Sequence, residues 1–216
     1  MAARRSSVSV SKRCARRLVL LSCATVLLAV LPFAAQDKGA CPEPIASLLP
    51  KDGAHRTGTY NAAGPMGLGS GAADLRFKHP CVTTTEFPAR LTIAVTYYGG
   101  ESAQLLQMQG DAVDQQTLQD AEQTLGKRHG APVRTEDLAG GKIVYVSFTS
   151  ACPAEGAGEG PDTRPPVPNV QLKGVARTDT VRMEVTLDGR ISLDLAKAAV
   201  AEVFQNLRKA RFEPAP

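Results

Sequence analysis

The stretch RLTIAVTYY, from Arg90 to Tyr98, decides the fold, because large apolar residues alternate in it with polar or small ones. Four of its residues share one face of an extended chain: Leu91, Ile93, Val95 and Tyr97. A period of two over nine residues predicts a β-strand with one buried face. Gly99-Gly100 ends the strand.

Beyond this strand the apolar period changes to that of a helix. Residues 101–108 and 114–129 predict helix, with Leu118, Ala121 and Leu125 on one stripe. Gly110 is expected to break or bend it. The acidic residues of the Gln-rich helix surface are expected to be solvated, with no acid–base role: Asp111, Asp114, Asp120 and Glu122.

Further strands and a second helix complete the pattern. Strands are expected at 74–79, 132–138, 142–150, 170–177 and 181–187, with turns at 139–141, 178–179 and 188–189. Ser192 can cap a helix that runs to about Ala210. The chain is therefore predicted to be α+β, with an antiparallel sheet of about six strands in ββα-ββ-ββα order and two long helices packed on it. In broad plan this order resembles secreted sheet-and-helix domains such as the PsbP-like group, and the resemblance implies no residue role.

The predicted domain organisation follows composition. Residues 1–35 are expected to be a signal peptide, and 36–73 a flexible arm with one short helix around Ile45. A single α+β domain is expected over 74–212, followed by a tail at 213–216. A Pro/Gly-rich loop at 151–168 interrupts the domain, as a mobile excursion or as a lid.

The N-terminus has the pattern of an export signal. Six basic residues precede the apolar run LVLLSCATVLLAVLPF at 18–33, and Ala34-Ala35 offers small residues for cleavage. A retained membrane anchor is the alternative, because sixteen apolar residues fall just short of the roughly 17 to 25 that span a bilayer. A lipoprotein box at Cys23 and a twin-arginine signal fit less well. We expect a secreted or periplasmic protein.

Charge excludes some partners once the leader is removed. The leader holds six of the 25 lysines and arginines and none of the 21 acidic residues, which leaves 19 basic and 21 acidic residues. This balance gives no reason to expect a nucleic-acid partner. A membrane contact is expected only if the leader is retained.

The glycine-rich stretch GLGSGA at 67–72 superficially matches a dinucleotide fingerprint. That fingerprint requires a buried strand before the glycines and a helix after them. Here a loop-like Asn-Ala-Ala-Gly-Pro sequence precedes them, so a flexible loop is predicted instead.

The mature chain has three cysteines, an odd number for an oxidising compartment. Cys81 and Cys152 both lie just past the ends of predicted strands, and these ends are on the same side of the predicted sheet. We therefore expect the two cysteines to form a disulfide, with Cys41 as the spare thiol. Pairing of Cys41 with either of them is the alternative.

The sequence HPC at 79–81 invites a sharper interpretation, as a Cys–His nucleophile pair or as two metal ligands. Nothing in the sequence fixes either geometry, so a disulfide beside a solvated histidine is preferred. The full sequence holds no His-Glu-x-x-His, Gly-x-Ser-x-Gly, P-loop, Cys-x-x-Cys or EF-hand motif.

Two functions follow from these observations. The first is a non-enzymatic binding or assembly module outside the cytoplasm, with an unknown protein or small-molecule ligand and with no cofactor, catalytic residue or metal ligand assigned. The alternative is a small extracytoplasmic hydrolase, with the 151–168 loop as its lid and His79 as its general base.

Overall fold

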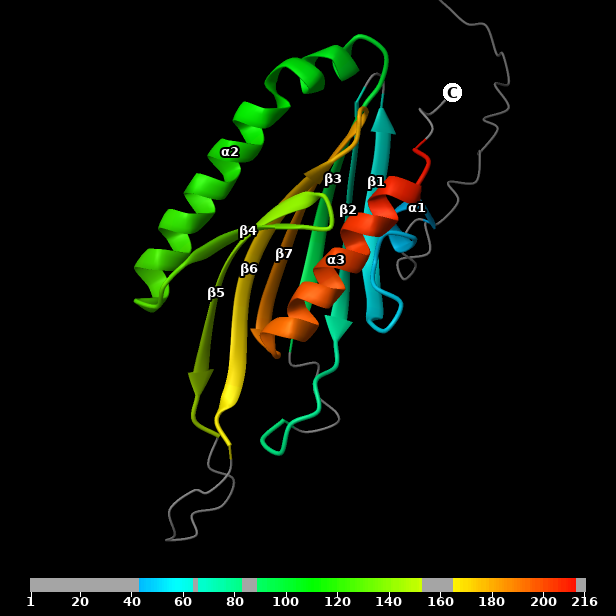
Figure 1. Ribbon diagram of the computed structural model, residues 1–216. Helices are drawn as coiled ribbons and strands as arrows, with labels where there is room; N and C mark the ends of the chain where they lie inside the picture. The colour runs from blue at the N-terminus through cyan, green and yellow to red at the C-terminus, as the bar shows by residue number, and fades with distance from the viewer. Residues whose placement is uncertain (1–42, 64–65, 83–88, 153–164, 213–216) are drawn as a thin grey trace, which may run out of the picture. The chain divides into compact units, whose positions relative to one another are not determined.

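The computed structural model describes residues 43–63, 66–82, 89–152 and 165–212 (Figure 1). The predicted leader, Cys41, most of the 151–168 loop and the 213–216 tail lie outside these ranges. Residues 37–216 form one compact unit.

Seven antiparallel strands form a single sheet in the order β1-β2-β3-β7-β6-β5-β4. The strands are β1 (Ala54–Ala63), β2 (Met66–Leu75), β3 (Ala89–Tyr98), β4 (Arg134–Leu138), β5 (Gly141–Ser150), β6 (Val167–Arg177) and β7 (Val181–Arg190). The α+β class and the antiparallel sheet are confirmed, and the predicted element order is met with one additional strand at the start. The turn expected at 188–189 is wrong, because β7 continues to Arg190.

The flexible arm predicted over 36–73 is wrong from Ala54 onward, because β1 and β2 form a hairpin there. Gly67, Gly69 and Gly71 are buried in β2 and lie opposite large apolar residues of β3. Because β3 supplies the large apolar side chains here, β2 can carry glycine at its buried positions. The sequence of β2 therefore lacks the apolar alternation that identifies a strand. The strand predicted at 74–79 is also wrong, because β2 ends at Leu75.

The short helix expected in the arm is present as α1 (Glu43–Ala46). Ile45, Leu48 and Leu49 are buried in the main core of the molecule. This apolar patch therefore docks the beginning of the described chain onto the sheet.

Helix α3 (Leu193–Lys209) covers one face of the sheet, which we call the α3 face. The Ser192 hydroxyl accepts a hydrogen bond from the Leu195 amide at 3.4 Å, so the predicted cap is confirmed. Phe204 of α3 lies directly on the sheet, because a Cβ added at Gly174 would stand 3.0 Å from its ring. Glycine in the centre of β6 thus permits close packing of α3.

Helix α2 (Ser102–His129) lies on the opposite face, the α2 face, where it runs along β5 and β6 and away from β1 and β2 (Figure 1). Its C-terminal half packs Leu118, Ala121 and Leu125 on three valines of the sheet, Val144, Val146 and Val175. Gly110 does not break the helix, which is continuous through it, and the other form of the expectation, a bend, stays a prediction. Gly130 ends it in the left-handed conformation that favours glycine.

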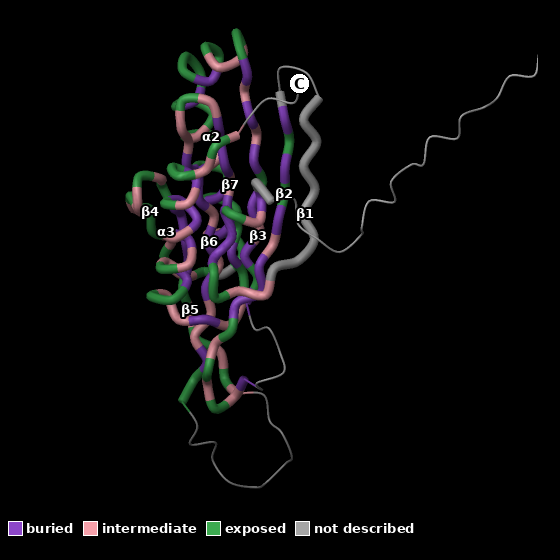
Figure 2. The backbone as a smooth tube through the Cα atoms, turned by 90° about the vertical axis from the view of Figure 1, so that its right-hand side faces the viewer, coloured by how far each residue is buried: buried purple, intermediate pink, exposed green. Residues whose placement is uncertain are grey.

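Helix α2 leaves part of its own face of the sheet uncovered. On β2 and β3 the residues of this face are exposed or half-buried, apart from Asp74, which is buried beside Arg90. The residues of the α3 face are buried, so the two classes alternate along most of both strands (Figure 2). Leu68 is 61% exposed at this surface. The sheet is therefore covered by helices on one face and only half covered on the other.

Candidate binding site

Cys81 and Cys152 form a disulfide with a Cα–Cα distance of 5.4 Å. It joins the segment after β2 to the end of β5, and the Pro165 carbonyl lies close to both sulfurs. The predicted pair is confirmed. A disulfide is typical of an oxidising, extracytoplasmic compartment.

His79 lies beside this disulfide, in a local structural contact. Its Nδ1 accepts a hydrogen bond from the Cys81 amide at 3.2 Å, and its ring stacks on Phe77 with 5.7 Å between the ring centres. Because Cys81 is in a disulfide, it is not available to act as a thiolate nucleophile. Among the described residues, no carboxylate contacts His79, and His79 lines neither of the two cavities below.

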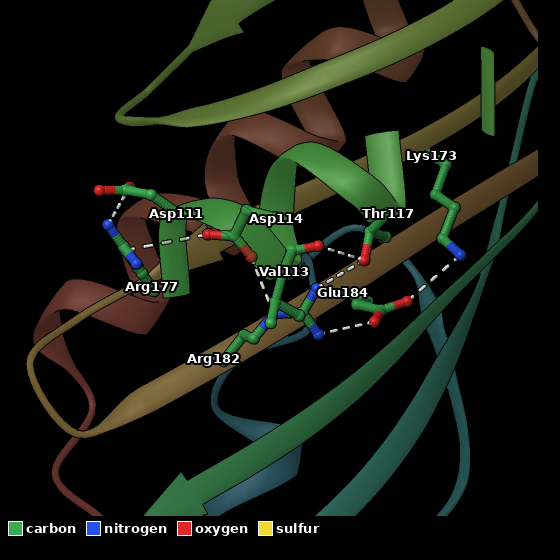
Figure 3. Close-up of polar contacts among 8 residues, drawn as sticks. All are labelled: Asp111, Val113, Asp114, Thr117, Lys173, Arg177, Arg182 and Glu184. Carbon is green, nitrogen blue, oxygen red and sulfur yellow. Dashed lines mark hydrogen bonds and ion pairs between the residues drawn. The ribbon is translucent and has the colours of Figure 1, made fainter. Parts of the chain in front are cut away.

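The N-terminal half of α2 buries one large apolar side chain, Leu106, and is otherwise attached to the sheet by charged side chains. Arg182 of β7 is only 8% exposed and lies at the centre of this contact (Figure 3). Its guanidinium donates to Asp114 at 2.8 Å, to Glu184 at 2.7 Å and to the Thr117 hydroxyl at 2.9 Å. One nearly buried arginine thus joins two positions of the helix to one of the sheet.

Two pKa shifts follow from this arrangement. Burial alone would lower the pKa of Arg182, but its hydrogen bonds to Glu184 and Asp114 outweigh burial and raise the pKa above its ordinary value. Burial alone would raise the pKa of Glu184, but the hydrogen bond from Arg182 and the charge of Lys173, 3.3 Å away, lower it. Both groups therefore remain charged at neutral pH.

Arg177, at the end of β6, extends this network toward the beginning of α2. It pairs with Asp111 and lies 3.8 Å from Asp114 (Figure 3). Its Nη1 packs against Gly110, in the space where any larger residue would place its Cβ, and this buried atom has no hydrogen-bond partner among the described residues. Arg177 therefore explains why residue 110, inside the helix, is glycine.

A cavity of about 710 Å³ lies between α2 and the β4–β5 hairpin. Its apolar lining comes from Leu118, Val144, Val175 and Ala176. Its charged lining comes from Asp111, Asp114, Glu122, Asp137, Lys142 and Arg177. The size lies within the roughly 300 to 1,000 Å³ that is typical of small-molecule sites.

Three of these charged residues are free to meet a ligand. Glu122, Asp137 and Lys142 are exposed, and none makes a side-chain hydrogen bond or ion pair with another described residue. Among the described residues, no group of three or more His, Cys, Asp or Glu side chains could hold a metal ion. The cavity therefore offers an apolar surface with both signs of charge around it.

A second, smaller cavity of about 250 Å³ lies on the other flank of α2. It is bounded by Asp120, Thr124 and Arg128 of the helix and by Lys173 and Thr186 of the sheet. It opens toward the uncovered part of the α2 face.

A third polar cluster ties β4 to α3 on the opposite side of the sheet. Lys197 contacts Glu136 at 2.7 Å and lies 4.6 Å from the centre of the Tyr145 ring. The hydrogen bond to Glu136 raises the pKa of Lys197. These contacts join β4, β5 and α3 through charged and aromatic side chains.

The network under α2 was missed by the sequence interpretation, which placed all four helix carboxylates in solvent. Asp114 is in fact 16% exposed and paired with Arg182, whereas the Asp111 side chain is 92% exposed and still meets Arg177. The available signal was an arginine and a glutamate two residues apart on the polar face of the predicted strand 181–187. Such a pair under a covering helix requires partners from that helix.

Comparison with known protein families, characterised proteins and solved structures finds no match. Separately, no helix among the described residues is long and apolar enough to cross a membrane.

Proposed function

We propose that this chain is an extracytoplasmic binding module, and that its ligand is a small molecule held in the cavity between α2 and the β4–β5 hairpin. The observation that carries the proposal is the 710 Å³ cavity with an apolar floor and with three charged side chains at its rim that pair with no other described residue. A ligand with an apolar body and one or more polar or charged groups would match this lining.

The attachment of α2 supports the same proposal. The half of the helix beside Asp111 and Asp114 is held by ion pairs, while the half beside Leu125 is held by apolar contact. The pair of Arg177 with Asp111 is exposed on the Asp111 side, so water can replace it at low cost, whereas the pair of Arg182 with Asp114 is nearly buried. A ligand would therefore enter beside Asp111, while Arg182 and the apolar contacts keep the helix attached.

Export through a cleaved leader is part of this proposal. The basic and apolar pattern of residues 1–35 and the disulfide between Cys81 and Cys152 support the same compartment. The intact mass of the exported protein tests it. A mass matching residues 36–216 less two hydrogens is expected, and a full-length mass would show a retained leader.

A tryptophan at the rim tests the ligand site. The chain has no tryptophan, so Thr135→Trp places both a blocking ring and a fluorescent probe at the cavity mouth. Thr149→Trp is the matched control, because Thr149 is an exposed strand threonine that does not line the cavity. A panel of small metabolites is screened by thermal shift on the wild-type protein.

We expect at least one compound that stabilises the wild type and Thr149→Trp but not Thr135→Trp, or that changes the tryptophan fluorescence of Thr135→Trp alone. Compounds that stabilise all three proteins equally bind elsewhere and would contradict the site. The same conclusion follows if no compound in a broad panel stabilises the wild type.

A further inference from the structure

The ion-pair network under α2 adds no net charge to the large cavity. It consists of three carboxylates and three cations: Asp111, Asp114, Glu184, Arg177, Arg182 and Lys173. Each of these charges already contacts a charge of opposite sign. A ligand in the cavity therefore meets mainly the charges of the lining that stand outside this network.

The lining charges outside the network are Glu122, Asp137 and Lys142. Glu122 belongs to α2 and Asp137 to β4, so a carboxylate faces the cavity from each of its two walls. All three side chains are exposed and pair with no other described residue. Two carboxylates against one ammonium group give the cavity an excess of one negative charge.

Glu122 has no cation beside it on its own helix. Side chains three and four residues apart are the ones that meet on a helix surface. Around Glu122 these positions carry no charge: Leu118, Gln119, Leu125 and Gly126. Thr135 and Val144, which line the cavity from the hairpin, are uncharged as well. Glu122 thus brings a carboxylate without a counter-charge to a cavity with an apolar floor.

Asp137 lies directly opposite Lys142 in the β4–β5 ladder, and among the described residues no ion pair joins the two. Lys142 limits the excess of negative charge in the cavity to one. Arg208 of α3 packs against Gly140 at the turn of the hairpin but does not line the cavity. A ligand with one positive charge therefore fits the lining better than a ligand with two.

We infer that the ligand of this cavity is an organic monocation, an amine with an apolar body whose ammonium group is held by Glu122 and Asp137. This inference rests on the proposed function and specifies the ligand class. An ammonium group has three N–H donors, so it can donate to carboxylates on two walls at once. The apolar body then lies over Leu118 and Val144. An anionic ligand would bring its charge against both carboxylates, and like charges in contact oppose binding.

Three indole compounds with the same ring and different end groups test the inference on the exported protein. They are tryptamine, a cation; tryptophol, a neutral alcohol; and indolepropionate, an anion. Because the chain has no tryptophan, the fluorescence anisotropy of each compound reports its binding directly. Since the carboxylates are exposed, we expect tryptamine to bind about fivefold more tightly than tryptophol, and indolepropionate to bind most weakly.

Variants of the lining locate the ammonium group. Glu122→Gln and Asp137→Asn should each weaken the binding of tryptamine by about two- to fivefold and leave that of tryptophol unchanged. Lys142→Gln should strengthen the binding of tryptamine, because it removes a competing positive charge.

Asp120→Asn is the matched control. Asp120 is an exposed carboxylate of the same helix that lines the small cavity and not the large one. This variant should bind tryptamine like the wild type. Circular dichroism and thermal melts of all four variants should match the wild type, since the substituted side chains are exposed.

The outcomes separate the ligand class from the ligand site. Equal affinities for the three indoles, all lost in Thr135→Tyr, would overturn the monocation and leave the cavity as the site. Tighter binding of free tryptophan, which adds a carboxylate to the same amine, would overturn it in favour of a zwitterion. Tryptamine that does not bind, that binds both carboxylate variants like the wild type or that is weakened by Asp120→Asn would also overturn it. In these last cases the metabolite panel with Thr135→Trp still decides whether the cavity holds another ligand.

Discussion

At the scale of single residues, Arg182 is only 8% exposed and donates hydrogen bonds to three other side chains. Its strand alternates apolar residues toward the α3 face with Arg182 and Glu184 toward α2. The Thr117 hydroxyl donates to the Val113 carbonyl at 2.9 Å and so presents its lone pair to the arginine. Every partner of Arg182 is thus positioned by its own backbone element.

Arg182→Met should destabilise the fold, because Asp114 and Glu184 lose their nearest cation and keep only the longer contacts to Arg177, at 3.8 Å, and Lys173, at 3.3 Å. We expect a loss of about 2 kcal/mol, below the roughly 3 to 5 kcal/mol seen for fully buried pairs, since both carboxylates keep some solvent. Urea unfolding measures it. Arg134→Met, at an exposed site, should change stability by less than about 0.5 kcal/mol.

Replacing the carboxylates as well should recover stability. Arg182→Met combined with Asp114→Asn and Glu184→Gln has no stranded charge, so it should be more stable than Arg182→Met alone. Equal stability of the single and triple variants would contradict this account of the network.

Glu184 makes stability depend on pH in the acid range. Its pKa is lowered in the folded state, so the unfolded state binds the proton more readily. Its stabilising contribution is fully present above the ordinary glutamate pKa of about 4.3 and is lost as the pH falls through the folded pKa. The free energy of unfolding should therefore fall less steeply below that pH in Glu184→Gln than in the wild type.

The Arg182→Met background provides the control for this effect. Since the hydrogen bond from Arg182 is the largest contribution that lowers this pKa, Glu184→Gln should change the acid slope less in that background. Equal changes of slope in both backgrounds would assign the effect to Lys173 instead.

At the scale of elements, the strands and helices that could be predicted are those whose own residues show a hydrophobic period. Strands β3 and β7 alternate large apolar residues with polar or small ones, β5 has an unbroken apolar run at 143–146, and α3 combines a cap at Ser192 with an apolar stripe. The hairpin of β1 and β2 was missed because Gly67, Gly69 and Gly71 occupy buried positions of β2. A strand whose inner face is glycine has no hydrophobic period, and only its pairing with β3 reveals it.

Helix α2 contains two glycines in different environments, and they should respond differently to alanine. Gly126→Ala meets only Val133, at 3.5 Å, so it should stabilise the protein by about 0.5 to 1 kcal/mol through helix propensity. Gly110→Ala should gain less or lose stability, because its Cβ displaces Arg177 from its carboxylates. Thermal and urea unfolding measure both.

Removing the arginine tests the cause. In an Arg177→Ala background the space beside residue 110 is free, so Gly110→Ala should then gain about as much as Gly126→Ala. A full gain from Gly110→Ala in the wild type would show that Arg177 moves aside at no cost.

At the scale of the whole molecule, the alternation of hairpins and helices was enough to predict the class and the antiparallel sheet. The same reasoning placed Cys81 and Cys152 beside each other at the ends of their strands, although the strand before Cys81 was predicted in the wrong place. The cavity could not be predicted, because it arises where α2 and the β4–β5 hairpin stand apart from each other above the sheet. That spacing is a property of the packed structure rather than of any one segment.

The disulfide links two strands that are not neighbours in the sheet. It ties the segment after β2 to the end of β5, and β3, β7 and β6 separate these two strands in the sheet. Its sequence separation of 71 residues corresponds to about 4 kcal/mol on the chain-entropy model.

Removing this bond should therefore cost the protein much of its stability. Cys81→Ser combined with Cys152→Ser should lose an amount near the chain-entropy value in urea unfolding, and reduction of the wild type should lose as much. Cys41→Ser should leave stability unchanged and the disulfide intact, as read by mass with and without alkylation. A Cys41→Ser variant as unstable as the double variant would show instead that Cys41 takes part in the stabilising bond.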